Sequence, residues 1–284
     1  MSNPISKHFS KGIWLMLLAT FSFSLMNIFA KLLHRLPVME IVFFRCFISV
    51  LFCTAALLKE KVSFKGTNFK PLISRGLTGT TALILYFITL HNIPMGTAVT
   101  IQYMSPIFSV VMAYLFLKQT INRLQWLCFV AAFIGVALIK GFDNSIQLNY
   151  LLIGLLSSML SAVSYTLISM MKKTEHPMLV VFYFMLIGSI VGFIGMLFHF
   201  EKPTLMEFVY LILVGITTQL GQINMTRALQ AEALGKVSIV QYIGIVFALI
   251  FGVLLFGETY TVLMLFGIAI IAASVVTNVL LAKN

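Results

Sequence analysis

The chain has 284 residues, of which 60% are hydrophobic and only 10% are charged, and its mean hydropathy is +1.04. A soluble domain carries about 25% charged residues and cannot bury so much apolar surface, so the composition argues against a soluble enzyme or a nucleic-acid-binding module. The formal net charge is +11, and in a membrane protein its distribution along the chain indicates topology.

Ten stretches of the chain are long and apolar enough to cross a bilayer as a helix, which requires about 20 mostly apolar residues. The connections between them are short, and the stretches are continuously apolar rather than alternating, which favours helices over barrel strands. The sequence therefore predicts an all-α polytopic membrane protein with ten transmembrane helices. In chain order they cover residues 12–33, 38–58, 72–90, 97–117, 124–140, 149–171, 178–198, 208–226, 236–256 and 261–281.

The basic residues are unevenly shared between the two sides that ten spans would create. Of the 19 lysines and arginines, 14 fall on the side of the N-terminus, Arg75 among them, four fall on the other side, and Arg45 lies within a span. Basic residues concentrate in cytoplasmic loops. The pattern predicts an inner (plasma) membrane protein with both termini in the cytoplasm and a nearly uncharged midplane.

The second half of the chain repeats features of the first half at an offset of 139 residues. The clearest repeated feature is a Gln-Tyr pair, Gln102-Tyr103 and Gln241-Tyr242, and the surrounding match pairs residues 96–120 with 235–259. A repeat of five spans places the second copy in the opposite orientation, as in many secondary transporters, whose substrate site lies near the midplane. We therefore expect two inverted five-helix repeats, residues 1–142 and 143–284.

Short segments of both halves also match the pattern of a known family. They include a first span that ends in Lys31, the opening of the second span from Glu40 to Arg45, and residues 96–106, 116–120 and 255–259. With two five-helix units, the chain resembles the EamA-type branch of the drug/metabolite transporter superfamily. The arrangement around Glu40 and Arg45 is similar to that of S-adenosylmethionine uptake carriers. Gln119 and Ile245 depart from the family pattern, which usually has Glu and Pro at these places.

Polar side chains within the predicted spans are candidates for a substrate cavity, since such groups cost free energy unless they have partners or line a wet space. Amide, hydroxyl and aromatic groups would suit a zwitterionic or heterocyclic metabolite. For serine and threonine residues, helix packing is the alternative explanation. The candidate cavity residues are Asn27, Tyr86, Gln102, Tyr103, Tyr165, Gln219, Gln222, Gln241 and Tyr242.

Three further residues are candidates for gating or structural roles. Arg45 lies about two turns inside its span and either meets a substrate carboxylate or packs structurally. Pro106 lacks a backbone donor and is expected to bend its helix. Glu40 lies near the outer end of the second span.

Together these features predict a secondary transporter, or permease, that moves a small organic metabolite across the inner membrane by alternating access. Amino acids and S-adenosylmethionine-like solutes are the candidate substrates. The expected partners are this solute and the lipid bilayer, without nucleic acid, catalytic residues, metal or cofactor; a monomer is one option for the oligomeric state. The alternatives are a channel, a lipid scramblase or a membrane-embedded enzyme. The enzyme would need a cluster of His, Asp or Glu at one membrane face, and Asp143, the only aspartate, has no such neighbours in the sequence.

Overall fold

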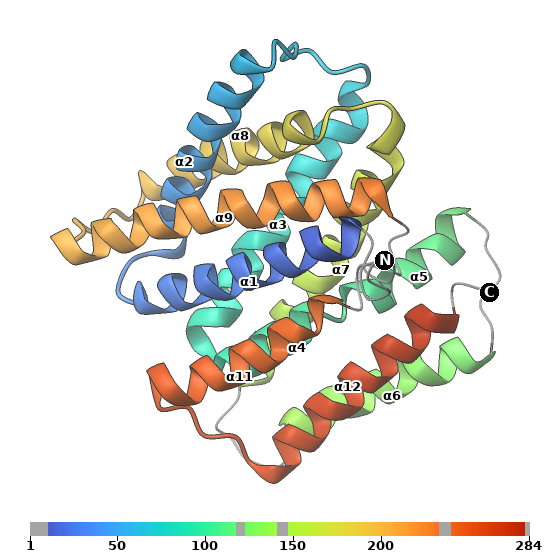
Figure 1. Cartoon of the computed structure of the whole chain (residues 1–284). Helices are drawn as coiled ribbons and strands as arrows, with labels where there is room; N and C mark the ends of the chain where they lie inside the picture. The colour runs from blue at the N-terminus through green and yellow to red at the C-terminus, as the bar shows by residue number, and fades with distance from the viewer. Residues whose placement is uncertain (1–10, 118–122, 141–146, 233–239, 282–284) are drawn as a thin grey trace, which may run out of the picture.

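A computed structural model describes residues 11–117, 123–140, 147–232 and 240–281, which form a bundle of α-helices (Figure 1). The helices are α1 (Lys11–Leu32), α2 (Val38–Lys59), α3 (Phe69–Asn92), α4 (Met95–Gln102), α5 (Ser105–Leu117), α6 (Arg123–Lys140), α7 (Leu148–Met170), α8 (Pro177–Met196), α9 (Leu205–Ala231), α11 (Ile243–Phe256) and α12 (Val262–Leu281), with a short 3₁₀ helix, η2 (Met171–Lys173).

The prediction of ten transmembrane helices in two inverted units of five is wrong for the described chain. Seven helices are long and apolar enough to cross a membrane: α1, α2, α3, α7 with η2, α8, α9 and α12. The predicted span 97–117 is two short helices, α4 and α5, and α11 has only 14 residues. Hydropathy did not reveal the interruption because residues 97–117 stay apolar across it. The predicted boundary between residues 142 and 143 lies outside the described residues and stays a prediction.

Local sequence signals fix several helix ends. Pro177 occupies the first turn of α8, where its missing N–H costs nothing. Thr204 and Glu207 form a reciprocal capping box at the start of α9. Gly257 ends α11 in the left-handed conformation, with φ of 61°, which glycine adopts without a steric penalty. These local signals set where α8 and α9 begin and where α11 ends.

The helices pair mainly across the two halves of the chain: α1 with α9, α2 with α8, α3 with α7, α4 with α11 and α6 with α12. Close approach depends on small residues. A Cβ atom at Gly192 of α8 would lie 2.6 Å from the main-chain nitrogen of Phe43 in α2, and one at Gly135 of α6 would lie 2.8 Å from the carbonyl oxygen of Gly267 in α12. These contacts join the first half of the chain to the second.

Large apolar side chains cover the outside of the bundle, while many polar ones are buried within it. Leu18, Leu51 and Val253 are among the many exposed apolar residues, each about half exposed. Such a surface is an aggregation hazard in water but matches a lipid environment. Together with the seven long apolar helices, it makes the chain a multi-pass membrane protein.

A central cavity as the candidate functional site

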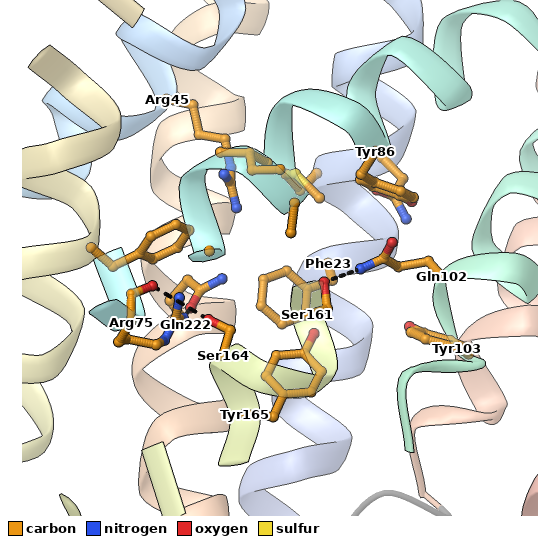
Figure 2. Close-up of a pocket in the computed structure, with 16 residues that line it drawn as sticks. Phe23, Arg45, Arg75, Tyr86, Gln102, Tyr103, Ser161, Ser164, Tyr165 and Gln222 are labelled. Carbon is orange, nitrogen blue, oxygen red and sulfur yellow. Dashed lines mark hydrogen bonds between the residues drawn. The ribbon is translucent and has the colours of Figure 1, made fainter. Parts of the chain in front are cut away.

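A cavity lies inside the bundle and is lined by side chains from α1, α2, α3, α4, α7, α8 and α9, together with Tyr103 (Figure 2). Its volume is about 90 Å³. Pockets for small molecules typically measure about 300–1,000 Å³. In this conformation the cavity therefore holds little more than solvent, and a metabolite requires the helices to move apart.

Two buried arginines form one side of the cavity. Arg45 of α2 and Arg75 of α3 are each only 2% exposed, and both line the cavity. The Nε atom of Arg45 donates to Thr218 Oγ1 at 2.8 Å, and one Nη atom of Arg75 lies 3.5 Å from Gln222 Oε1. Both arginines are thus held to α9 by neutral oxygen atoms.

Each of the two guanidinium groups lies over an aromatic ring. The guanidinium carbon of Arg45 lies 5.5 Å from the ring centre of Phe87, and that of Arg75 lies 4.2 Å from the ring centre of Phe184. Such cation–π contacts stabilise the charge in part. The guanidinium N–H groups are the hydrogen-bond donors of both side chains.

Neither arginine forms an ion pair with an acid among the residues that the structure describes. Several acids have their contacts elsewhere: Glu201 and Glu207 bind Arg35, Glu258 binds Lys31, and Glu175 accepts the main-chain N–H of Asn68. Within the same described ranges, one Nη atom of Arg45 and the Nε atom of Arg75 are buried without any hydrogen-bond partner. Buried donors of this kind are rare and call for an explanation.

The opposite side of the cavity carries amide and phenol groups. The Tyr86 hydroxyl donates to Asn27 Oδ1 at 2.9 Å. Gln102 Nε2 donates to Ser161 Oγ at 2.7 Å, while the Ser157 hydroxyl lies 2.8 Å from Gln102 Oε1. Figure 2 shows Tyr86 and Gln102 across the cavity from the two arginines. The cavity therefore has a cationic side and a neutral polar side.

The helix wall is interrupted at the tyrosine of each repeated Gln-Tyr pair. Helix α4 ends at Gln102 and α5 begins at Ser105, so the interruption lies just before Pro106; the bend expected at Pro106 stays a prediction. Residues 240 and 241 are helical, and Tyr242 then breaks the helix before α11. Because no proline follows at Ile245, proline alone does not account for both interruptions. Broken helices commonly line the substrate sites of transporters.

Most, though not all, of the candidate cavity residues lie together. Asn27, Tyr86, Gln102, Tyr103, Tyr165 and Gln222 line the cavity, as does Arg45. Gln219, Gln241, Tyr242, Glu40 and Pro106 do not line it. Whether any of these residues binds substrate stays a prediction.

The residues outside the cavity have other contacts. Gln219 Nε2 lies 3.6 Å from Met178 Sδ, and Gln241 Nε2 lies 3.3 Å from Met16 Sδ. The Tyr242 hydroxyl donates to the main-chain carbonyl of Tyr103. Of the two repeated glutamines, Gln102 lines the cavity and Gln241 packs against Met16, so their surroundings differ.

Arg75 is a charged cavity residue that sequence reasoning missed. It counted among the 14 basic residues of the N-terminal side because it lies near a predicted span end, whereas the structure begins α3 at Phe69 and buries Arg75 within it. The available signal was helical spacing. Arg75, Gly79, Ala82 and Tyr86 follow one another at intervals of three or four residues and all line the cavity. The nearly uncharged midplane stays a prediction, while two charged side chains, Arg45 and Arg75, are buried in the bundle.

An ion pair joins several elements at the end of the bundle where α1 terminates. Lys31 pairs with Glu258, and Lys31 Nζ also donates to the Ile93 carbonyl at 3.0 Å. The Glu258 carboxylate accepts the Met95 N–H at the start of α4, at 2.8 Å, where negative charge is favoured by the helix dipole. Burial raises the pKa of Tyr260, which donates to Glu258, so this phenol stays neutral.

Glu40 lies at the same end of the bundle but is separate from this cluster. Its side chain is buried, and one carboxylate oxygen accepts the Glu201 N–H at 3.2 Å. The exposed Arg35 side chain nearby bridges Glu201 and Glu207 at 3.0 and 2.6 Å. Glu40 thus anchors the connection between α8 and α9 rather than contacting Arg45.

Some residues of the sequence repeat lie outside the described residues. These are the matched positions 118–120 and 235–239, including Gln119.

Comparison with known proteins identifies the same kind of protein over nearly the whole chain. The model of the EamA-like transporter family matches residues 10–141 and, a second time, residues 148–280. The pseudopaline exporter CntI of Pseudomonas aeruginosa is 34% identical over 250 residues, which cover 87% of this chain and 88% of that protein.

More distant relatives are transporters as well. Human solute carrier family 35 member G1 is 27% identical and is matched over 88% of this chain and 73% of its own length. The S-adenosylmethionine uptake transporter of Rickettsia bellii is 24% identical, with 90% and 89% covered. A solved crystal structure with 14% identity shares the fold, with a TM-score of 0.66 over 93% of this chain and 97% of the other. The two family matches and the 34% identity show that the chain belongs to the EamA-like transporter family.

Proposed function

We propose that this family member is a secondary transporter that moves a small organic metabolite by alternating access. The observation that carries the proposal is the buried polar cavity, which is built from helices of both halves of the chain and is bordered by an interrupted helix. Amino acids and S-adenosylmethionine-like solutes remain candidates, and the second is also the solute named for the Rickettsia bellii relative.

The small cavity volume fits a state that is closed around the site. At about 90 Å³, the space excludes most metabolites, so entry requires a second conformation. The cluster around Lys31 and Glu258 ties α1, the start of α4 and the connection before α12 at one end of the bundle. Release of these contacts is a direct way to open that end.

We further propose an inner-membrane location with both termini in the cytoplasm. Counting Arg75 with the cavity leaves 13 basic residues, 14 minus one, on the side of the N-terminus against four on the other. The excess still favours a cytoplasmic N-terminal side. Labelling of single cysteines introduced near Lys61 and Lys202 with an impermeant reagent in intact cells would test this orientation.

Reconstitution into proteoliposomes tests the proposed activity. A carrier should show saturable uptake of a metabolite, accelerated when the same unlabelled metabolite is present on the opposite side. A channel or a scramblase, the alternatives, would show no such counter-stimulation. If no metabolite that stabilises the purified protein is taken up, the transport proposal is wrong.

A further inference from the structure

We propose that Arg45 and Arg75 form a binding site for a dianionic organic solute, through either two carboxylates or one phosphate group. The inference rests on the proposed transport function and adds the chemical class of the substrate. Both side chains line one cavity, both are 2% exposed, and each presents a nitrogen without a partner among the described residues.

The charge around the cavity supports an anionic ligand. A buried cation requires a counter-charge or strong hydrogen bonds. Thr218 and Gln222 supply only neutral oxygens, and the ion pairs formed by described residues do not include Arg45 or Arg75. A ligand that carries two negative charges would supply the counter-charge that the surrounding side chains do not provide.

The geometry of the guanidinium groups favours carboxylate or phosphate over a simple halide. The guanidinium groups lie over the rings of Phe87 and Phe184, and their N–H groups match the spacing of the oxygen pairs in carboxylate and phosphate. Cation–π contact also holds the side chains in place before binding. Less conformational freedom is then lost when the anion arrives.

The rest of the cavity sets how such a solute would lie. Gln102 and Tyr86 are across from the arginines (Figure 2), and the Tyr165 ring lies beside the space between them. The hydroxyl groups of Tyr103 and Tyr165 make no hydrogen bond within the described part of the chain, so they too are available. The anionic end of the solute would therefore face α2 and α3, and a neutral polar end would face α4.

The first experiment measures thermal stabilisation of the purified, detergent-solubilised protein by matched panels of metabolites. The panels are dicarboxylates such as succinate and glutarate, phosphate monoesters such as glycerol phosphate, the corresponding amides or esters, and diamines such as putrescine. Ligand binding raises the melting temperature by mass action. We expect hits among the dianions, with the first two panels identifying the anionic group. Hits only among neutral or cationic compounds, or no dianion among the hits, would overturn the inference.

The second experiment uses Arg45→Gln and Arg75→Gln, with Arg35→Gln as the matched control. Each cavity substitution should weaken binding of a dianionic hit about tenfold or more, as expected for a lost charge-assisted hydrogen bond. Arg35 lies outside the cavity in an exposed ion pair, so its substitution should leave binding unchanged.

A structural role for the arginines predicts a different result. If the arginines serve ligand binding, replacing either one removes an unpaired buried charge, so the melting temperature of the ligand-free protein should stay unchanged or rise. If both cavity variants melt lower without ligand and still bind the dianion normally, the arginines are packing residues and the inference is wrong. If the two glutamine variants cannot be purified, Arg75→Lys replaces them, because it keeps the charge but loses the paired donors. A binding site predicts weaker binding of the dianion by Arg75→Lys, and unchanged binding would overturn the inference.

The two proposals fail separately. Dianion binding that depends on Arg45 and Arg75, without flux in proteoliposomes, would leave the site standing and refute transport. Saturable flux of a neutral or cationic metabolite that is unaffected by either substitution would leave transport standing and refute the anion site.

Discussion

The hydroxyl of Tyr242 donates a hydrogen bond to the main-chain carbonyl oxygen of Tyr103 over 2.7 Å. The two rings also meet edge to face, with centroids 6.0 Å apart. Each tyrosine stands at an interruption of its helix, so this contact joins the broken points of α4 and of the helix that continues as α11.

Tyr242→Phe should lower stability by about 1 kcal/mol, because it removes one buried hydrogen bond and leaves the Tyr103 carbonyl without that donor. Tyr103→Phe is the matched control, since the acceptor is a main-chain atom and the ring is retained. Thermal or chemical unfolding in detergent measures both. An equal loss of stability in the two variants would contradict the stabilising role of the hydrogen bond from Tyr242 to the Tyr103 carbonyl.

Gln102→Ala should reduce ligand-induced stabilisation, whereas Gln241→Ala should not. Gln102 lines the cavity and organises Ser157 and Ser161, but Gln241 packs against Met16 outside it. The shift in melting temperature at saturating ligand gives the comparison. An equal loss of ligand-induced stabilisation in both variants would indicate that Gln102 and Gln241 belong to one substrate site, as the sequence repeat suggests.

Lys31→Met and Glu258→Gln should show strong coupling in a double-mutant cycle. The two charges pair directly, and their side chains are largely buried, so either single change leaves its partner without a counter-charge. We expect a coupling free energy of about 0.5–3 kcal/mol from unfolding measurements. Additive effects would show that the ion pair contributes little, as exposed pairs commonly do.

Gly192→Ala should destabilise the bundle by about 1–3 kcal/mol, through overpacking at the contact of α8 with α2. The added Cβ would meet the main chain of Phe43, which cannot rotate away as a side chain can. Ile190→Ala on the same helix serves as the control, because that residue is 52% exposed on the outer surface. A larger loss for Ile190→Ala would contradict this account of the contact.

The continuously apolar stretches of the sequence predicted the positions of most helices, but not which of them are long enough to cross a membrane. The span predicted at 38–58 corresponds to α2, Val38–Lys59. By contrast, the span predicted at 97–117 is divided after Gln102. An interruption stabilised by a distant hydroxyl, that of Tyr242, leaves no trace in local hydropathy.

The candidate site was predicted in part because polar residues within apolar helices are few. Asn27, Tyr86 and Gln102 were identified in this way and line the cavity. Gln241 was grouped with Gln102 by sequence repetition, yet repeated residues need not have equivalent neighbours. Arg75 was counted with the basic residues of the N-terminal side because it lies near the end of the predicted span 72–90, whereas its place within α3 buries it.

The two arginines of the cavity also have an electrical consequence. An empty cavity that holds two positive charges becomes neutral when a dianion binds, so the membrane voltage acts differently on the empty and the loaded protein. Moving one elementary charge through 100 mV changes the energy by about 2.3 kcal/mol. We therefore expect transport by this protein to depend on membrane potential, to the extent that Arg45 and Arg75 move within the field as the helices rearrange.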